Sequence, residues 1–519
     1  MSTKTITPTA LRAFWRRGEE VALFDLREEG PFSLAHPFWA VSLPLAQIEL
    51  RIRALAPRLT APIVVYDDGE GLTQRGVARI AALGYTDVAI LEGGLTAYAK
   101  DGEVFRDVNV PSKAFGELVE AIRHTPSAPP EEVKRLIETE DNLVVLDGRR
   151  FEEFNVMSLP RGRSVPNGEL ALRVHDIAPS AETTIVVNCA GRTRSIIGTQ
   201  TLVNLGLPNR VLALRNGTIG WTLAGQKLAH GATDKFSTAS PEGHARARQA
   251  AAAYAAKAGV RIIGADTLAA WRQDASRTLY LLDVRTPEEY AAGHAAGFVS
   301  APGGQLVQAT DEWVGVRGGR LVLFDDDGVR ARSSAAWLVQ LGWDAVVLEE
   351  GALQATETVP PAAPEIPPPP VPAVAAVDVP GNGYVIADLG PSPVYNRGHI
   401  PGAWFLAGSQ LGDVAKLPGN GPILLTSSDG RLAAAHAADI AAATKREVLW
   451  LDGGNAAWKA AGRELSTVPL WASQPDDVYK RPYEGTDNAA AAMQAYIDWE
   501  LQLVAQLAND GVSNFHVIR

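Results

Sequence analysis

The chain has 519 residues, 46% of them hydrophobic and 21% charged, which is ordinary for a globular protein and too long for a single core. Its net charge of −11 argues against nucleic acid as a partner, and its single cysteine excludes an intrachain disulfide framework. The sequence shows neither a signal peptide nor a membrane-spanning apolar run, so we expect a cytoplasmic protein with no membrane partner.

Four copies of one pattern follow each other along the chain. In each copy an apolar strand ends in Asp, a second apolar strand ends in a polar loop, a helix follows, and a third strand ends in a glycine turn. We expect the first strands at residues 23–25, 145–147, 281–283 and 386–388. We expect the second strands at 63–66, 185–188, 321–324 and 423–426, and the third strands to end at 91–94, 214–217, 348–351 and 451–454.

The spacing of the landmarks indicates duplication. The Asp of the first strand and the residue after the second strand lie 42 positions apart in Asp25 and Asp67, Asp147 and Cys189, and Asp283 and Asp325. The fourth copy has Asp388 and Ser427, which lie 39 positions apart. Eleven positions after each first-strand Asp stand His36, Ser158, His294 and His399.

Strands that alternate with helices predict an α/β fold of four tandem domains, each a mainly parallel sheet flanked by helices. We place the domains at 1–108, 109–235, 236–358 with a linker helix, and 359–519 with a Pro-rich linker and a C-terminal helix. The connecting segments are expected as packing helices at 110–123, 243–257 and about 488–508, and as an extended spacer at 360–372.

Cys189 opens a polar loop between a predicted buried strand and a predicted helix. A thiol at that junction faces helix N-terminal amides, and two arginines follow within five residues, so we expect a lowered thiol pKa and a reactive thiolate. The alternative is a small buried hydrophobic residue. From Asp147 to Thr222 the chain has nine arginines, six acidic residues and no lysine, and this local excess suits a small anionic substrate unless the arginines are scattered surface charges.

At these residues the chain resembles the rhodanese family. The stretch from Asp283 to Tyr290, followed by Gly293 and His294, is similar to the family's first motif, and so is the stretch from Gly398 to Ala403. The loop that begins at Cys189 resembles the six-residue active-site loop of sulfurtransferases. The resemblance covers all four copies and implies a four-domain, thiosulfate sulfurtransferase-like enzyme that needs no cofactor.

The resemblance also implies residue roles. Cys189 is the nucleophile that accepts a sulfane sulfur and becomes a persulfide, and the loop that binds the substrate comprises Ala190, Gly191, Arg192, Thr193, Arg194 and Ser195. Inward N–H groups of such a loop form an anion nest, and a glycine lets the backbone curl there. The two guanidinium groups are expected to bind an oxyanion rather than to be solvated surface charges. Thr193 and Ser195 could donate hydroxyl hydrogen bonds or cap the helix.

The resemblance also bears on residues that support the Cys189 loop and on the loops that lack a cysteine. Asp147 and Arg149 match the family's first-strand pair and are expected to brace the loop. Asp67, Asp325 and Ser427 stand where Cys189 stands, and because none is a thiol we expect those copies to be inactive. The acidic loops at Asp67 and Asp325 could bind a divalent cation, although solvated charge is the favoured interpretation; no metal-ligand spacing is found.

The leading hypothesis is therefore transfer of sulfur from thiosulfate or a similar donor to cyanide, a thiol or a protein acceptor. A non-enzymatic sulfur carrier or scaffold is the alternative. A Cys-dependent phosphatase or arsenate reductase is disfavoured, because that chemistry places Arg six residues after the cysteine and this chain has Ser195 there.

Overall fold

The computed structural model describes residues 4–361, 369–379 and 383–519. It forms two compact units: the first groups the first and fourth copies, and the second groups the second and third copies. The first unit comprises residues 1–8, 22–108 and 363–479, and the second comprises 9–21, 109–362 and 480–519. Among the described residues, no helix is both long and apolar enough to cross a membrane. Much of the spacer expected at 360–372 lies outside the described residues.

The first unit contains the sheets of the first and fourth copies, and their strands pair in parallel. The first sheet has the order β1 (Lys4–Ile6), β6 (Val88–Leu91), β5 (Ile63–Tyr66), β2 (Val21–Asp25) and β4 (Ala40–Ser42). The fourth has the order β19 (Ala373–Val374), β23 (Val448–Leu451), β22 (Ile423–Thr426), β20 (Val385–Asp388), β21 (Trp404–Phe405) and β24 (Leu470–Trp471). The helices of these copies in this unit are α2 (Glu29–Leu34), α3 (Ile48–Leu55), α4 (Thr73–Ala82), α5 (Gly94–Tyr98), α17 (Ser392–Arg397), α18 (Arg431–Ala443) and α19 (Gly454–Ala460). Helix α1 (Pro8–Arg17) precedes the first copy's β2 in the sequence, and its residues from Thr9 onward are part of the second unit.

The second unit contains the second and third copies. The second sheet has the order β10 (Gly162–Ser164), β9 (Leu143–Asp147), β11 (Thr184–Asn188), β12 (Val211–Leu214) and β8 (Ser127–Ala128). The third has the order β13 (Arg261–Ile263), β18 (Asp344–Leu348), β17 (Arg320–Phe324), β14 (Leu279–Asp283) and β15 (Val299–Ser300). Their helices are α7 (Pro130–Thr139), α8 (Phe151–Val156), α9 (Asn167–Ile177), α10 (Thr193–Asn204), α11 (Gly217–Leu223), α13 (Ala265–Gln273), α14 (Pro287–Ala292), α15 (Gly303–Gln308) and α16 (Arg330–Gln340).

The middle of each inner strand is apolar because helices cover both faces of a parallel sheet, as in Ile185, Val186 and Val187 of the second copy. In the second copy β11 is fully buried and pairs with β9 and β12. Its register aligns Asn188 with Asp147, so the strand ends that carry the site residues lie at one edge of the sheet. The predicted α/β class with four parallel sheets is confirmed.

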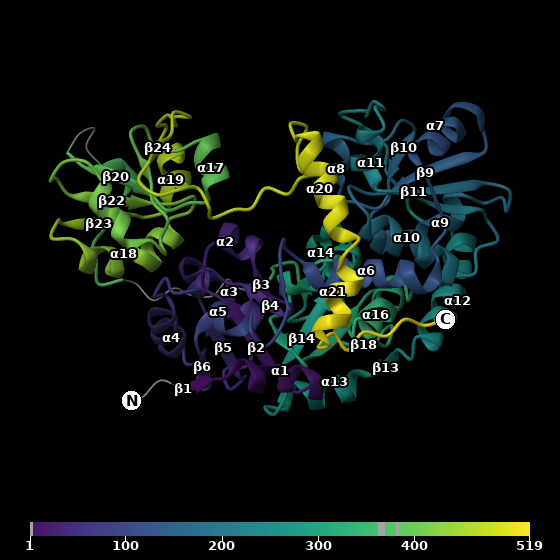
Figure 1. The fold of residues 1–519 in the computed structure, drawn as a ribbon, viewed down its shortest axis with the longest axis horizontal. Helices are drawn as coiled ribbons and strands as arrows, with labels where there is room; N and C mark the ends of the chain where they lie inside the picture. Colours follow the sequence, from purple (N-terminus) through teal and green to yellow (C-terminus); the bar gives the residue numbers. More distant parts are fainter. Residues whose placement is uncertain (1–3, 362–368, 380–382) are drawn as a thin grey trace. The chain divides into compact units, whose positions relative to one another are not determined.

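The second unit is completed by helices from outside its two sheets (Figure 1). They are α6 (Val110–Arg123), α12 (Pro241–Lys257), α20 (Ala490–Glu500) and α21 (Leu503–Asp510). The segment expected as one helix at 488–508 is thus divided into two. Helix α6 packs against α10, α20 and α21, while α20 also packs against α11, so the end of the described chain borders the second copy.

Candidate active site

Cys189 lies where the second copy's central strand gives way to a helix. Strand β11 ends at Asn188, and α10 begins at Thr193. Parallel α/β sheets bind ligands beyond the carboxyl ends of their strands, and a helix N-terminus favours negative charge. The position therefore suits a nucleophile that carries an anion.

The thiol is buried, with 1% of Cys189 exposed. Its Sγ donates to Ser195 Oγ at 3.5 Å, and that hydroxyl donates onward to the Arg192 carbonyl at 2.9 Å. Burial raises the pKa of the Cys189 thiol, although the charge of Arg194 and hydrogen bonds from Ser195 counteract part of this effect. The expected lowering is therefore wrong in direction, because the lost hydration of the thiolate outweighs the nearby arginine.

A glycine turn from the third strand supports the start of the loop. The backbone N–H groups of Thr218 and Ile219 donate to the carbonyls of Cys189 and Ala190, at 2.8 and 3.0 Å. Gly217 has a φ of +56°, and a Cβ there would lie 2.4 Å from the Cys189 carbonyl oxygen. Only glycine fits this approach without displacement. The sequence pattern contained this turn but not its contact with the loop.

Arg192 is held by carboxylates from α6. Its guanidinium donates to both oxygens of Glu117, at 2.7 and 2.9 Å, and also to Glu120. The remaining nitrogen donates to the Asn216 side chain at 2.8 Å. Because these partners already hold the guanidinium, donor binding by Arg192 would require rearrangement of this network.

Arg194 forms a second buried ion pair. It donates to both oxygens of Glu153 in α8, at 2.8 and 2.9 Å. Burial alone would raise the pKa of Glu153, but the charges of Arg194 and Arg149 and the hydrogen bonds of the pair lower it to about 2. The local excess of arginine is thus largely balanced by carboxylates, and a role of the two loop arginines in donor binding stays a prediction.

Asp147 and Arg149 form a fully buried brace beneath the loop. The guanidinium donates to both carboxylate oxygens, at 2.8 and 2.7 Å, and to the Met157 carbonyl at 2.6 Å. The Asn188 side chain also donates to Asp147, at 3.0 Å. Equivalent Asp–Arg pairs are present at Asp25 with Arg27 and at Asp283 with Arg285, as a shared structural element would require.

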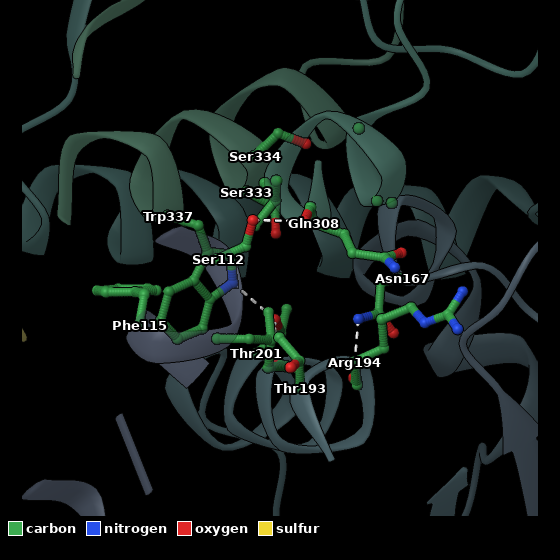
Figure 2. Close-up of a pocket in the computed structure, with 15 residues that line it drawn as sticks. Ser112, Phe115, Asn167, Thr193, Arg194, Thr201, Gln308, Ser333, Ser334 and Trp337 are labelled. Carbon is green, nitrogen blue, oxygen red and sulfur yellow. Dashed lines mark hydrogen bonds between the residues drawn. The ribbon is translucent and has the colours of Figure 1, made fainter. Parts of the chain in front are cut away.

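Thr193 and Arg194 border a small cavity behind the loop, which helices from the third copy close on the other side (Figure 2). Its volume is about 20 Å³, enough for one water molecule. The Asn167 side chain donates to the Arg194 carbonyl at 2.8 Å, and Trp337 of α16 donates to Thr201 of α10 at 2.8 Å. The third copy therefore supports the helix that follows the Cys189 loop.

Gly191 has a different importance from the one expected. The backbone of Gly191 does not have a positive φ, so the loop does not need glycine for its curl. A Cβ at Gly191 would instead lie 3.1 Å from the Tyr496 ring and 3.3 Å from Glu500 Oε2. Close packing by α20 is therefore what favours glycine here. Nothing local in the sequence joined this helix to the loop.

The three loops without cysteine fill the same backbone cradle with their own side chains. Asp67 accepts from the N–H groups of Leu72 and Thr73, at 2.6 and 3.3 Å. Asp325 accepts from three loop N–H groups, those of Gly328, Val329 and Ala331, at 3.2, 3.0 and 2.9 Å. Ser427 Oγ accepts from the Ala433 N–H at 3.4 Å.

One amide recurs in all four loops. The N–H six residues after the first loop position contacts that position's side chain: Thr73 in the first copy, Ala331 in the third, Ala433 in the fourth and Ser195 in the second. Carboxyl groups therefore lie on these amides in the first and third copies, although burial and the neighbouring Asp327 raise the pKa of Asp325 to about 7. Within residues 4–361, 369–379 and 383–519, no group of three or more His, Cys, Asp or Glu side chains is placed to hold a metal ion.

The histidines of the other copies make backbone contacts. His294 Nδ1 lies 3.0 Å from the Tyr290 carbonyl and His399 Nδ1 lies 2.7 Å from the Tyr395 carbonyl, and each ring stacks on that tyrosine. His36 contacts the carbonyls of Pro37 and Asp107, at 2.8 and 3.0 Å. These contacts agree with the packing and hydrogen-bonding role expected for them.

Comparison with known proteins gives a family and a full-length structural relative. A model described as "Rhodanese-like domain" matches residues 7–101, 129–224, 265–357 and 376–461. The crystal structure of thiosulfate sulfurtransferase from Pseudomonas aeruginosa is 49% identical, with a TM-score of 0.96, over 99% of this chain and 100% of that one. No curated protein matches the chain.

Two other solved structures are distant. A rhodanese-related protein from Thermoplasma volcanium is 20% identical over 20% of this chain and 97% of its own, with a TM-score of 0.18. EanB in complex with ergothioneine is 17% identical over 67% of this chain and 96% of its own, with a TM-score of 0.20. The four matched segments and the full-length relative together establish that this chain belongs to the rhodanese family.

Proposed function

We propose that the chain is a sulfurtransferase that moves a sulfane sulfur from thiosulfate, or a similar donor, to a thiophilic acceptor through a persulfide on Cys189. The observation that carries the proposal is the position of the one thiol in a loop whose counterparts seat carboxylates on equivalent amides. The relative named as a thiosulfate sulfurtransferase supports the donor class.

The reaction is a double displacement. The Cys189 thiolate attacks the sulfane sulfur of thiosulfate, the S–S bond of the donor breaks, and sulfite leaves with the bonding electrons. The resulting persulfide keeps one negative charge, which loop amides stabilise. An acceptor such as cyanide or a thiol then attacks the terminal sulfur and regenerates the Cys189 thiolate.

Proton movement at Cys189 follows the hydrogen bonds of the resting loop. The thiol proton faces Ser195 Oγ, whose own proton faces the Arg192 carbonyl. Rotation of the Ser195 hydroxyl toward the sulfur would stabilise the thiolate after deprotonation. The charge of Arg194 favours the same form.

The proposed approach for donor and acceptor is a pocket of about 200 Å³, which is lined by two residues that contact the loop rather than by the loop itself. Thr218 and Ile219, whose N–H groups hold the start of the loop, form one wall, and Tyr483 and Met493 form another. A protein acceptor is compatible with this pocket if it presents a single thiol. The cytoplasmic location expected from the sequence stays a prediction.

Intact mass spectrometry after mixing the protein with thiosulfate tests the proposal. One added sulfur is expected in the wild type and none in Cys189→Ser. Steady-state thiocyanate formation with cyanide then separates an enzyme from a stoichiometric sulfur carrier. Absence of the added sulfur in folded wild-type protein would refute the persulfide step.

A further inference from the structure

Helix α20 brings a buried carboxyl group to the catalytic loop. Glu500, the last residue of this helix, is 1% exposed. Its Oε1 accepts from the Tyr496 hydroxyl at 2.8 Å. Its Oε2 has no hydrogen-bond partner among the described residues. A buried carboxyl oxygen without a donor is costly when it is charged.

The free oxygen is directed at the loop. The Cβ that Gly191 lacks would lie 3.3 Å from Glu500 Oε2 and 3.1 Å from the Tyr496 ring. Gly191 is two residues after Cys189, so the carboxyl group packs against the backbone that surrounds the sulfur. Glu500 is accordingly among the groups that raise the pKa of Cys189.

The charges that face Glu500 come from two other elements. Helix α6 contributes Lys113, whose Nζ lies 5.3 to 5.7 Å from the ring centres of three aromatic residues, and Glu117, which pairs with Arg192 of the loop. Burial, and to a lesser extent the charge of Glu117, raise the pKa of Glu500, while Lys113, the Tyr496 hydrogen bond and Arg192 lower it, and the result is a pKa of about 8. Glu500 is therefore neutral at pH 7.

We propose that Glu500 is a positioning residue for sulfur transfer: its neutral carboxyl group lets an anion form at Cys189, and its ionised form opposes that anion. The inference rests on the proposed function and adds a residue to its site. Like charges in a buried site disfavour each other, so a carboxylate beside the loop works against a thiolate, a persulfide and a dianionic donor alike.

Alkylation of the single cysteine tests this directly, because iodoacetamide is uncharged and can modify only one thiol. The rate is measured from pH 6 to 10 by intact mass for the wild type, Glu500→Gln and the control Asp498→Asn. Asp498 is an exposed carboxylate on the same helix, which accepts from Gln494, so its removal changes the net charge as Glu500→Gln does above pH 8, where Glu500 is ionised.

We expect Glu500→Gln to match the wild type within about twofold below pH 7, where Glu500 is neutral. Above pH 8 the variant should react faster, with the midpoint of its profile lower by about one pH unit, a tenfold change in thiolate fraction. Asp498→Asn should superimpose on the wild type. Tyr496→Phe, which removes the donor to Oε1, should give a smaller shift in the same direction and serves if Glu500→Gln does not fold.

Two results would overturn the inference. One is a Glu500→Gln profile identical to that of the wild type at every pH. The other is an equal change of rate at every pH, which is what a purely structural role produces. Alkylation needs no sulfur donor, so a protein without thiosulfate turnover would refute the proposed function and leave this test intact.

Discussion

The Cys189 loop and the Asp325 loop are two versions of one backbone structure within the same unit of the molecule. Each follows the central strand of its sheet, and in each the amide six residues onward contacts the first side chain. In the third copy the Asp325 carboxylate occupies this cradle, and Asp327 accepts from the N–H groups of Val329 and Arg330. In the second copy a neutral thiol stands there.

The difference between Asp325 and Cys189 shows why one loop position can hold a fixed charge in one copy and is proposed to transfer sulfur in another. A carboxylate satisfies the loop amides permanently and cannot leave, whereas a sulfur atom can be added and removed. The third copy keeps the architecture and supports α10 from the other side of the small cavity. A copy without the thiol therefore lacks a sulfur acceptor but still packs against and supports the copy that has one.

The largest effect on sulfur transfer is expected when the Cys189 loop is given the residue that the Asp325 loop carries at the same position. Cys189→Asp should lower sulfur transfer by about 1,000-fold or more, because no sulfur acceptor remains. The carboxylate should settle on the loop amides as Asp325 does, so the thermal unfolding midpoint should stay near that of the wild type. Steady-state turnover and thermal unfolding check both parts, and residual turnover above about 1% would contradict the assignment of Cys189.

The reverse conversion should fail. Asp325→Cys in a Cys189→Ser background should give less than about 1% of wild-type turnover, because Asp327 already accepts from loop amides and its charge would raise the pKa of a thiol there. Added mass after thiosulfate treatment measures the outcome. Turnover close to that of the wild type would show that neighbouring loop charges matter little.

Removing the Arg194 guanidinium should lower the stability of the fold. Arg194→Ala should destabilise the fold by about 3 kcal/mol, because it removes the bidentate partner of Glu153. Arg150 is exposed and contacts the same carboxylate at 3.5 Å, so the control Arg150→Ala should change stability by about 0.5 kcal/mol or less. The pKa of Glu153 is lowered to about 2, so the ion pair contributes above pH 4.5 and its contribution is lost as pH falls toward 2. Urea unfolding at pH 7 and pH 3 should show a smaller difference between wild type and variant at the lower pH.

An oppositely directed effect on stability is expected at Glu500. Its pKa is raised to about 8, so the wild type loses stability as pH rises from about 4.5 to 8, where the unfolded chain has released a proton that the folded one retains. Glu500→Gln should therefore gain on the order of 4 kcal/mol at pH 8 and almost nothing at pH 4. Unfolding curves at the two pH values measure this, and an equal gain at both would exclude ionisation as its cause.

Much of the fold was predictable because its signals are local. The repeated strands end where the spacing of their Asp residues indicated, and the helix expected at 110–123 is α6. The family resemblance carried by the first-strand motifs and the Cys189 loop is confirmed by the family match.

The surroundings of the site were not predictable in the same way. Glu117 lies 75 positions from Arg192, and Glu500 lies far beyond the third and fourth copies, so no local pattern connects either to the loop. Burial sets the direction of the Cys189 pKa shift, and the local sequence does not show this burial, which is why the neighbouring arginines misled the prediction. Gly191 was expected to let the backbone curl, which the structure does not show, and packing by Tyr496 and Glu500 favours glycine there instead.

Because the same amide contact recurs in the four loops, hydrogen exchange at these amides should respond to a sulfur donor in the Cys189 loop but not in the other three. Where a carboxylate is seated on the N–H groups, as at Asp325, amide hydrogen exchange should be slow whether or not a donor is present. Around Cys189 the same N–H groups gain an anionic partner only when the sulfur is charged. Their hydrogen exchange should therefore slow when Cys189 carries a persulfide and recover when the sulfur is transferred. The amides of the loops without cysteine would serve as an internal reference in the same molecule.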